Sequence, residues 1–275
     1  MKRVIISLPI LKISLEQNSC KQVGMENRRD FIKQAALLTA AAGFPAIAQA
    51  KTEFSSLNTD TDLRILFQGD SITDGNRTRN EDWNHVMGHG YQYIISSKLW
   101  YEEPERKFHF FNRGVSGNKV SDLALRWQTD TLDLKPDVLS ILVGVNDAND
   151  AVKDKLKDSS LKYQSGYRDL LNRTKENNPK IRFIICEPFL LRVGRVKDDW
   201  ETWWEEVSKR QVIAKALADE FDAVFVPFQL AFDRALKRAP AEYWIWDGIH
   251  PMPAGHELMA RQWIKEVHKK LKFIS

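Results

Sequence analysis

The feature that most constrains the fold is an alternation of short apolar runs with longer segments of helical pattern. Between and after the runs, helical patterns occur at about Tyr91–Trp100, Val120–Trp127, Leu161–Asn177, Trp204–Phe221 and Ala254–Leu271. Apolar strands separated by helices predict a parallel sheet of about five strands with helices on both faces. The five runs that we interpret as strands are Leu63–Phe67, Phe108–Phe111, Val138–Val143, Ile181–Cys186 and Ala223–Val226.

Residues 1–50 have the pattern of an export leader. Arg28 and Arg29 precede an alanine-rich apolar stretch that ends in a small-residue cleavage pattern at Ala50. The paired arginines resemble the twin-arginine export signal. We therefore expect cleavage after Ala50 and a mature protein that is periplasmic or extracellular. A short amphipathic helix is the alternative interpretation of this segment.

The sequence predicts three further divisions of the chain. Met25 stands at the head of the leader pattern, so residues 1–24 are a candidate upstream mis-start, and whether Met1 or Met25 is the true start stays open. Residues 51–62 are a polar lead-in, and residues 63–275 are expected to form a single domain.

Charge and cysteine content exclude several classes of function. Subtracting the leader's seven basic and three acidic residues from the chain's 41 and 37 leaves 34 of each. A mature chain with no net charge is not expected to bind nucleic acid or an anionic membrane. Cys20 leaves with the leader, and Cys186 lies in an apolar run, which predicts a buried core thiol.

Small and polar residues follow the predicted strands at the points where they end. Gly69-Asp70-Ser71 follows the first strand, residues 114–118 (GVSGN) follow the second, and a loop with Asn146 follows the third. A late loop, residues 246–251, reads WDGIHP. Since the carboxyl ends of parallel strands share one edge of a sheet, these residues are expected to meet there.

Together these residues have the composition that acyl transfer requires. Ser71 is a weak nucleophile until a base such as His250 takes its proton, and Asp247 can orient that base. The Ser71 and Gly117 backbone N–H groups and the Asn146 amide are candidate donors to an oxyanion. Taken singly, each residue has a structural alternative as a helix cap, a turn residue or a surface ion pair.

Four blocks carry a resemblance to a known family. GDSITDG, GVSGN, GVND and DGIHP occur here in the order found in the SGNH, or GDSL-type, hydrolases, over about Leu63 to Trp263. The resemblance implies a flavodoxin-like three-layer α/β/α sandwich, with Ser71, Asp247 and His250 as the catalytic triad. It implies Ser71, Gly117 and Asn146 as the oxyanion donors. No metal or other cofactor is expected, because the triad supplies both nucleophile and base.

Further segments, among them the Arg126-Trp127 pair, resemble the bacterial acetyl xylan esterases of this family. This predicts an exported esterase that removes O-acetyl groups from a carbohydrate. Alternatives are a lysophospholipase or thioesterase of the same fold, and a catalytically inactive carbohydrate-binding module. The sugar, the ester position and the oligomeric state, including a homo-oligomer, stay open.

Substrate contacts are predicted less directly. Asp70 is nominated because it adjoins Ser71. Trp83 and Trp246 lie in loops, where both core packing and a platform for a sugar ring stay open. A short acyl group is expected to be crowded by a set of five residues, namely Asp70, Ile72, Val115, Asn146 and Ile249.

Overall fold

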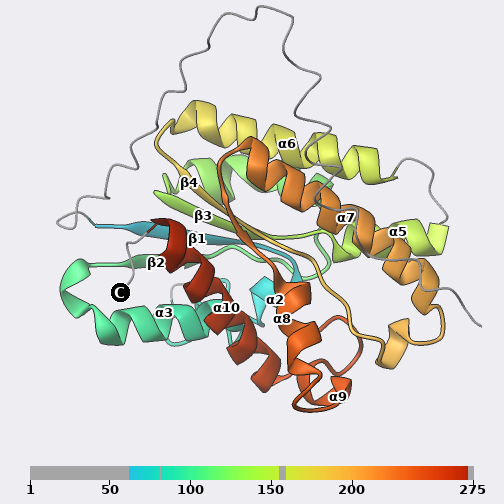
Figure 1. The fold of residues 1–275 in the computed structure, drawn as a ribbon. Helices are drawn as coiled ribbons and strands as arrows, with labels where there is room; N and C mark the ends of the chain where they lie inside the picture. Colours follow the sequence, from blue (N-terminus) through green and yellow to red (C-terminus); the bar gives the residue numbers. More distant parts are fainter. Residues whose placement is uncertain (1–61, 81, 155–158, 272–275) are drawn as a thin grey trace, which may run out of the picture. The chain divides into compact units, whose positions relative to one another are not determined.

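The computed structural model describes residues 62–80, 82–154 and 159–271 (Figure 1). The predicted leader, residues 1–50, and nearly all of the lead-in lie outside the described residues. The strands in the described part form one parallel sheet in the order β2-β1-β3-β4-β5. Every predicted strand is confirmed to within two residues at its ends: β1 (Arg64–Gly69), β2 (His109–Asn112), β3 (Val138–Leu142), β4 (Arg182–Cys186) and β5 (Val224–Val226).

Helices connect these strands and cover the sheet. The predicted helices are confirmed as α3 (Tyr91–Glu102), α4 (Val120–Trp127), α6 (Ser159–Asn177), α7 (Trp200–Glu220) and α10 (Pro253–Leu271). Five helical segments that the sequence pattern did not predict are α2 (Ser71–Asp74), the π-helical turn η2 (Gln128–Leu132), α5 (Val145–Asp154), α8 (Phe228–Ala235) and α9 (Ala241–Trp244). Two short 3₁₀ turns are η1 (Pro104–Arg106) and η3 (Gly194–Val196).

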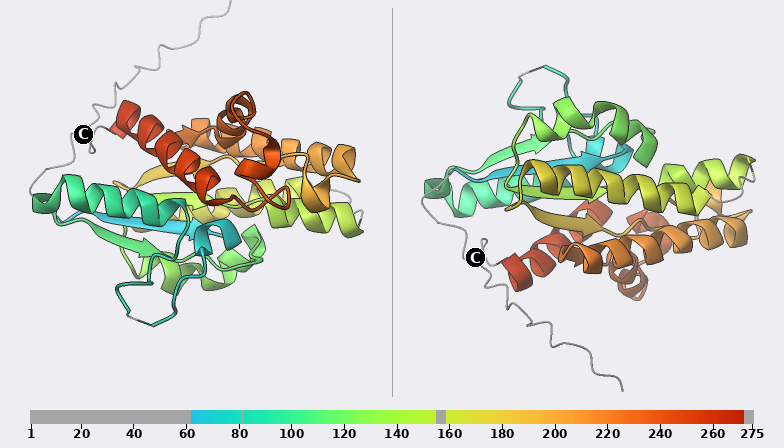
Figure 2. Two further views of the ribbon diagram at one scale, coloured as in Figure 1. Left: turned by 90° about the horizontal axis from the view of Figure 1, so that it is seen from below. Right: turned by 90° about the horizontal axis from the view of Figure 1, so that it is seen from above.

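The two faces of the sheet carry different helices (Figures 1 and 2). Ile65 and Phe67 of β1 pack into one core with α3, α8 and α10. Leu66, between them, packs into a second core with α4, α6 and the carboxyl-terminal half of α7. This alternation follows from the two-residue repeat of a strand. It confirms the predicted three-layer α/β/α sandwich.

The strand order creates a topological switch point at the carboxyl edge of the sheet. From β1 the chain passes through α3 on one face to β2, whereas from β3 it passes through α6 on the other face to β4. The connections that leave β1 and β3 therefore diverge to opposite faces, although Gly69 and Leu142 are paired in register. Such a switch point is where open α/β sheets bind their ligands. Ser71 and Asn146 follow the two strands that flank it.

A polar contact in the core fixes α10 against the sheet. Trp263 is fully buried, and its indole N–H donates to the Ser140 Oγ of β3 at 3.0 Å. Its ring lies 5.7 Å from that of Phe67. Cys186 is buried beside Ser140, as predicted, and burial raises the pKa of its thiol to about 12. The middle of α10, the helix that follows the WDGIHP loop, is thereby fixed against the sheet.

Asn146 lies in the first turn of α5 and not in a loop, which corrects the sequence interpretation. The α5 segment, VNDANDAVKD, is mostly polar and buries only small side chains (Val145, Ala148 and Ala151) against its neighbours. The buried positions recur at the three-residue spacing of a helix, but they are small side chains in a mostly polar segment, so the apolar signal in the sequence is weak. The helix restricts the backbone of Asn146 more than a loop would.

Within the described residues, no helix combines the length and the apolar character that crossing a membrane requires.

Candidate active site

Ser71 lies where β1 turns into the single-turn helix α2. Asp70 caps this helix, with its Oδ1 accepting from the Ile72 N–H at 3.1 Å. The Asp70 side chain is 1% exposed, and burial raises its pKa to about 7 against the opposing effects of the Ile72 N–H and His250. A side chain this buried offers no surface to a substrate. The structure thus assigns Asp70 to the turn beneath Ser71 and not to substrate contact.

The WDGIHP loop brings a histidine to this serine. Ser71 Oγ lies 2.8 Å from His250 Nε2, although the two residues are 179 positions apart. On the other side of the ring, His250 Nδ1 lies 2.8 Å from Asp247 Oδ2. With the Nδ1 proton donated to the carboxylate, Nε2 is free to accept the Ser71 hydroxyl proton. The three predicted catalytic side chains therefore form one hydrogen-bonded chain.

Asp247 is held in its charged form. Burial alone would raise its pKa, but hydrogen bonds from the His250 ring and from the backbone N–H groups of His250 and Ile249 lower it to about 2. An isolated antiparallel bridge between Ile245 and Pro251 closes the base of the loop. The acid and the base are thus positioned by the backbone of their own loop as well as by each other.

The predicted oxyanion donors reach the same edge of the sheet. Gly117 has a φ of 83°, and the space where a Cβ would lie is open, so its backbone is accessible to a ligand. One N–H of the Asn146 amide donates to the Asn118 carbonyl oxygen at 3.2 Å. This contact orients the amide and leaves its second N–H for another acceptor.

Several residues that the sequence interpretation missed tie these loops together. Asp74 Oδ2 accepts from the Ser116 N–H at 3.0 Å and from Arg79 at 2.7 Å. The side-chain amide of Asn112 donates to the Thr73 and Asp74 carbonyl oxygens, at 2.8 and 3.1 Å. Asp74 lies inside the GDSITDG block and Asn112 lies two residues before GVSGN, and these positions at strand ends were the available signal.

Arg126 connects two of the loops through three contacts. Its Nε donates to Asn118 Oδ1 at 2.8 Å, and its Nη1 donates to the Arg113 carbonyl oxygen at 2.7 Å. Its Nη2 reaches the Gly69 carbonyl oxygen at 3.5 Å. Arg126 was singled out in the sequence only as part of a family resemblance. The structure gives it a physical role, which is to hold the Ser71 turn against the Gly117 loop.

The two tryptophans nominated for substrate contact lie in different places. Trp246 is 60% exposed, and its ring stacks on that of His250 with the centroids 6.1 Å apart. Trp83 packs against Trp100, whose indole N–H donates to the Phe108 carbonyl oxygen just before β2 begins. That contact places Trp83 toward the amino edge of the sheet. Trp246, by contrast, remains at the candidate site.

A histidine behind the site links two helices. His256 Nδ1 accepts from the Tyr91 N–H at 3.1 Å, which joins the start of α3 to α10. Burial, followed by the neighbouring His250 and His89, lowers the pKa of His256 to about 4. His256 is therefore neutral near pH 7 and acts as a structural acceptor beside the candidate base.

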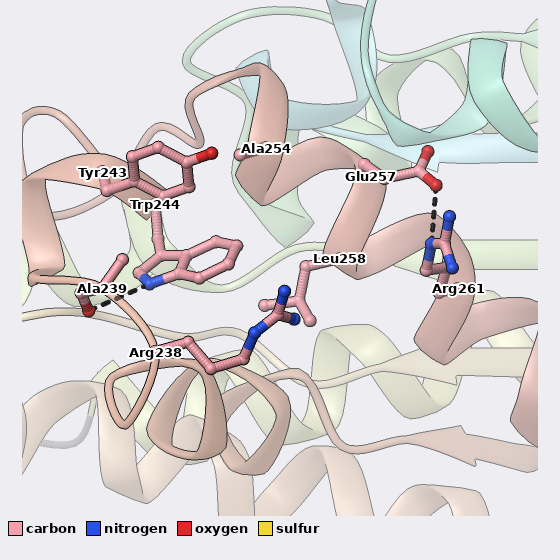
Figure 3. Close-up of a pocket in the computed structure, with 8 residues that line it drawn as sticks. All are labelled: Arg238, Ala239, Tyr243, Trp244, Ala254, Glu257, Leu258 and Arg261. Atoms are coloured by element: carbon pink, nitrogen blue, oxygen red, sulfur yellow. Dashed lines mark hydrogen bonds and ion pairs between the residues drawn. The ribbon is translucent and has the colours of Figure 1, made fainter.

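A separate groove of about 580 Å³ lies between α9 and the first turns of α10 (Figure 3). Tyr243 and Trp244 form one wall, and Arg261, which is bonded to Glu257 at 2.6 Å, lies on α10. None of the predicted catalytic residues lines this groove. Over the described ranges, no group of three or more His, Cys, Asp or Glu side chains is arranged to hold a metal ion.

Comparisons with known proteins agree with this geometry. Residues 67–258 match the model of the GDSL-like lipase/acylhydrolase family. The chain is 34% identical over 211 residues to an acetylxylan esterase of Geobacillus stearothermophilus, an alignment that covers 74% of this chain and 93% of that enzyme.

Solved structures show the same likeness. A putative GDSL-like lipase from Parabacteroides merdae has a TM-score of 0.73 and 40% identity, covering 79% of this chain and 99% of its own. The Geobacillus acetylxylan esterase Axe2 has a TM-score of 0.67 and 31% identity, covering 77% and 96%. The chain therefore belongs to the GDSL-like lipase/acylhydrolase family and is a carboxylic ester hydrolase.

Proposed function

We propose that this protein is an exported serine esterase that removes O-acetyl groups from a carbohydrate such as acetylated xylan or its oligosaccharides. The observation that carries the proposal is the hydrogen-bonded chain from Ser71 Oγ through His250 to Asp247, with 2.8 Å at each step. The similarity to an acetylxylan esterase over nearly that enzyme's whole length supports the choice of substrate.

The proposed reaction passes through an acyl-enzyme. Ser71 Oγ attacks the ester carbonyl while His250 Nε2 takes its proton, and Asp247 stabilises the imidazolium that forms. The negative charge on the carbonyl oxygen is met by the Ser71 and Gly117 backbone N–H groups and by the free N–H of Asn146. His250 then protonates the departing sugar oxygen. Water activated by the same imidazole releases acetate from Ser71.

Trp246 supports a sugar as the leaving group. One face of its indole stacks on His250, and the ring is largely exposed. An exposed indole beside the base offers a flat apolar surface on which the face of a sugar ring can pack. A sugar in this place would have its ester oxygen close to His250 Nε2, which is the proton donor for the leaving group.

The surroundings of Ser71 support a short acyl group. Of the five residues expected to crowd it, Asp70, Ile72 and Ile249 are buried, and Asp70 and Ile72 flank Ser71 in the chain. Val115 and Asn146 are partly exposed. Buried side chains on both sides of the nucleophile in the chain favour a short acyl group over a long alkyl chain.

Replacing Asn146 with Ala should lower kcat by about two to three orders of magnitude and leave KM nearly unchanged. The physical reason is that the Asn146 amide donates its full hydrogen bond to the substrate's carbonyl oxygen only when that oxygen carries the negative charge of the transition state. Steady-state kinetics on p-nitrophenyl acetate measure both constants. Asn172→Ala, on the exposed face of α6, is the matched control and should behave as wild type. A change confined to KM would mean that Asn146 binds the ground state.

The value of kcat/KM should fall from p-nitrophenyl acetate to the butyrate and the octanoate. In an apolar channel each buried methylene would stabilise the bound substrate by about 0.8 kcal/mol, which is roughly a fourfold gain in affinity. The kcat/KM of a lipid esterase should therefore rise with acyl chain length. Acetate release from acetylated xylo-oligosaccharides should also be observed. A rise toward octanoate would overturn the acetylesterase proposal in favour of a lysophospholipase or thioesterase. Absence of any ester hydrolysis would favour the binding module.

Trp246→Ala provides an internal control for this substrate panel. It should raise KM for the acetylated oligosaccharide several-fold while leaving p-nitrophenyl acetate hydrolysis close to wild type, because only the sugar needs the platform. Equal effects on both substrates would mean that Trp246 acts through His250 and not through the sugar.

The export part of the proposal rests on the leader pattern in residues 25–50. In its native host the mature protein should begin at Lys51 and lie outside the cytoplasm, as N-terminal sequencing of fractionated cells would show. Replacing Arg28 and Arg29 together with Lys should block export by the twin-arginine route. Recovery of the active protein with residues 1–50 attached would contradict the assignment.

A further inference from the structure

The connection after β4 lies directly against the WDGIHP loop. The Leu191 N–H donates to the Gly248 carbonyl oxygen at 3.1 Å, and the Arg195 N–H donates to the Asp247 carbonyl oxygen, also at 3.1 Å. Arg195 belongs to the short 3₁₀ turn η3, which begins at Gly194. Two backbone hydrogen bonds thus fasten this connection to the WDGIHP loop, and one of them joins the η3 turn to the acid of the candidate triad.

Gly194 is what permits so close an approach. Its φ is 58°, and a Cβ at this position would lie 2.4 Å from the Asp247 Cα. A side chain there would collide with backbone, which cannot move aside without displacing Asp247. The η3 turn and the acid are therefore packed together more tightly than any residue except glycine would allow.

The Arg195 side chain continues the contact. Its Nε lies 3.3 Å from Asp247 Oδ2, the same oxygen that accepts from His250 Nδ1. The other oxygen, Oδ1, accepts from the backbone N–H groups of Ile249 and His250. The Asp247 carboxylate is nearly buried, whereas the Arg195 side chain is 51% exposed. A guanidinium from outside the loop thus shares an oxygen with the catalytic base.

We propose that Arg195 is a positioning residue that sets the pH at which His250 becomes able to accept a proton. The inference rests on the proposed role of His250 as general base. A positive charge on the shared carboxylate disfavours a second positive charge on the imidazole, so the neutral, proton-accepting ring persists to lower pH. The guanidinium also limits rotation of the carboxylate, since Oδ2 is bonded from two sides.

Other titratable groups also interact electrostatically with His250, and the variants compared must leave these groups unchanged. Asp70, buried beneath Ser71, has its pKa raised to about 7 by burial, and the charges of His250 and Asp70 interact. His256 of α10 interacts with His250 as well. Neither contacts Arg195 in the described structure, so both are present equally in wild type and in Arg195 variants. A difference between two pH profiles therefore isolates the contribution of Arg195.

The test is the pH dependence of kcat/KM for p-nitrophenyl acetate in wild type, Arg195→Ala, Arg195→Gln and Arg195→Lys. Loss of the positive charge makes the protonated imidazole easier to form, so the acidic limb should move to higher pH. Because the ion pair is half exposed, we expect the acidic limb to move by about half a pH unit in the Ala and Gln variants. The Lys variant keeps the charge, so its acidic limb should move little. The displacement should shrink at 1 M salt, where the Debye length is about 3 Å.

Arg192→Ala is the matched control. Arg192 lies on the same connection, is 62% exposed and pairs only loosely with Glu201 at 4.0 Å. The acidic limb of the kcat/KM profile of Arg192→Ala should coincide with that of wild type. Coincident limbs for wild type and both neutral Arg195 variants, or an equal displacement in Arg192→Ala, would overturn the inference. A wild-type protein that hydrolyses no ester would instead refute the proposed function, so the two failures are distinguishable.

Discussion

The shared carboxyl edge of β1 and β3 is the constraint on which the rest of the site depends. The two strands are paired in register up to Gly69 and Leu142, and their connections leave toward opposite faces of the sheet. Ser71 and Asn146 consequently flank one switch point of the sheet. The WDGIHP loop then needs only to be brought over that edge. Burial of Trp263 against β3, which anchors the helix that follows the loop, accomplishes this.

Two aspartates at the site show how local hydrogen bonding determines the charge of a buried group. Asp70 accepts one described hydrogen bond and is almost completely enclosed, so burial dominates and its pKa rises to about 7. Asp247 is also nearly buried, but several donors converge on it, and its pKa falls to about 2. The same side chain thus serves as a helix cap in one place and as a permanent anion beside His250 in the other. The largest opposing effect at Asp247 is the hydrogen bond from the His250 ring, and Asp70 has no such side-chain donor among the described residues.

The strands, and the meeting of Ser71, His250 and Asp247 at one edge of the sheet, could be predicted from the sequence because their signals are local. An apolar run identifies β3, and the short spacing from Asp247 to His250 lets one loop carry both acid and base. The α5 helix could not be predicted this way, because it is mostly polar and buries only small side chains. Arg195 and Arg126 were beyond reach for a different reason. Their roles depend on contacts with residues 52 and 57 positions away, which only the folded backbone defines. Trp83 and Trp246 looked equivalent in sequence, and packing alone separates them.

The central claim is that Ser71 forms the covalent intermediate, and labelling with a fluorophosphonate tests it most directly. The mature protein should be labelled once, on the peptide that contains Ser71, as mass spectrometry of a digest would show. His250→Ala should slow the labelling by several orders of magnitude, because the hydroxyl loses its base. Ser71→Ala should abolish both labelling and ester hydrolysis while its circular dichroism stays that of wild type. Labelling of a different serine, or hydrolysis at the wild-type rate by Ser71→Ala, would contradict the account.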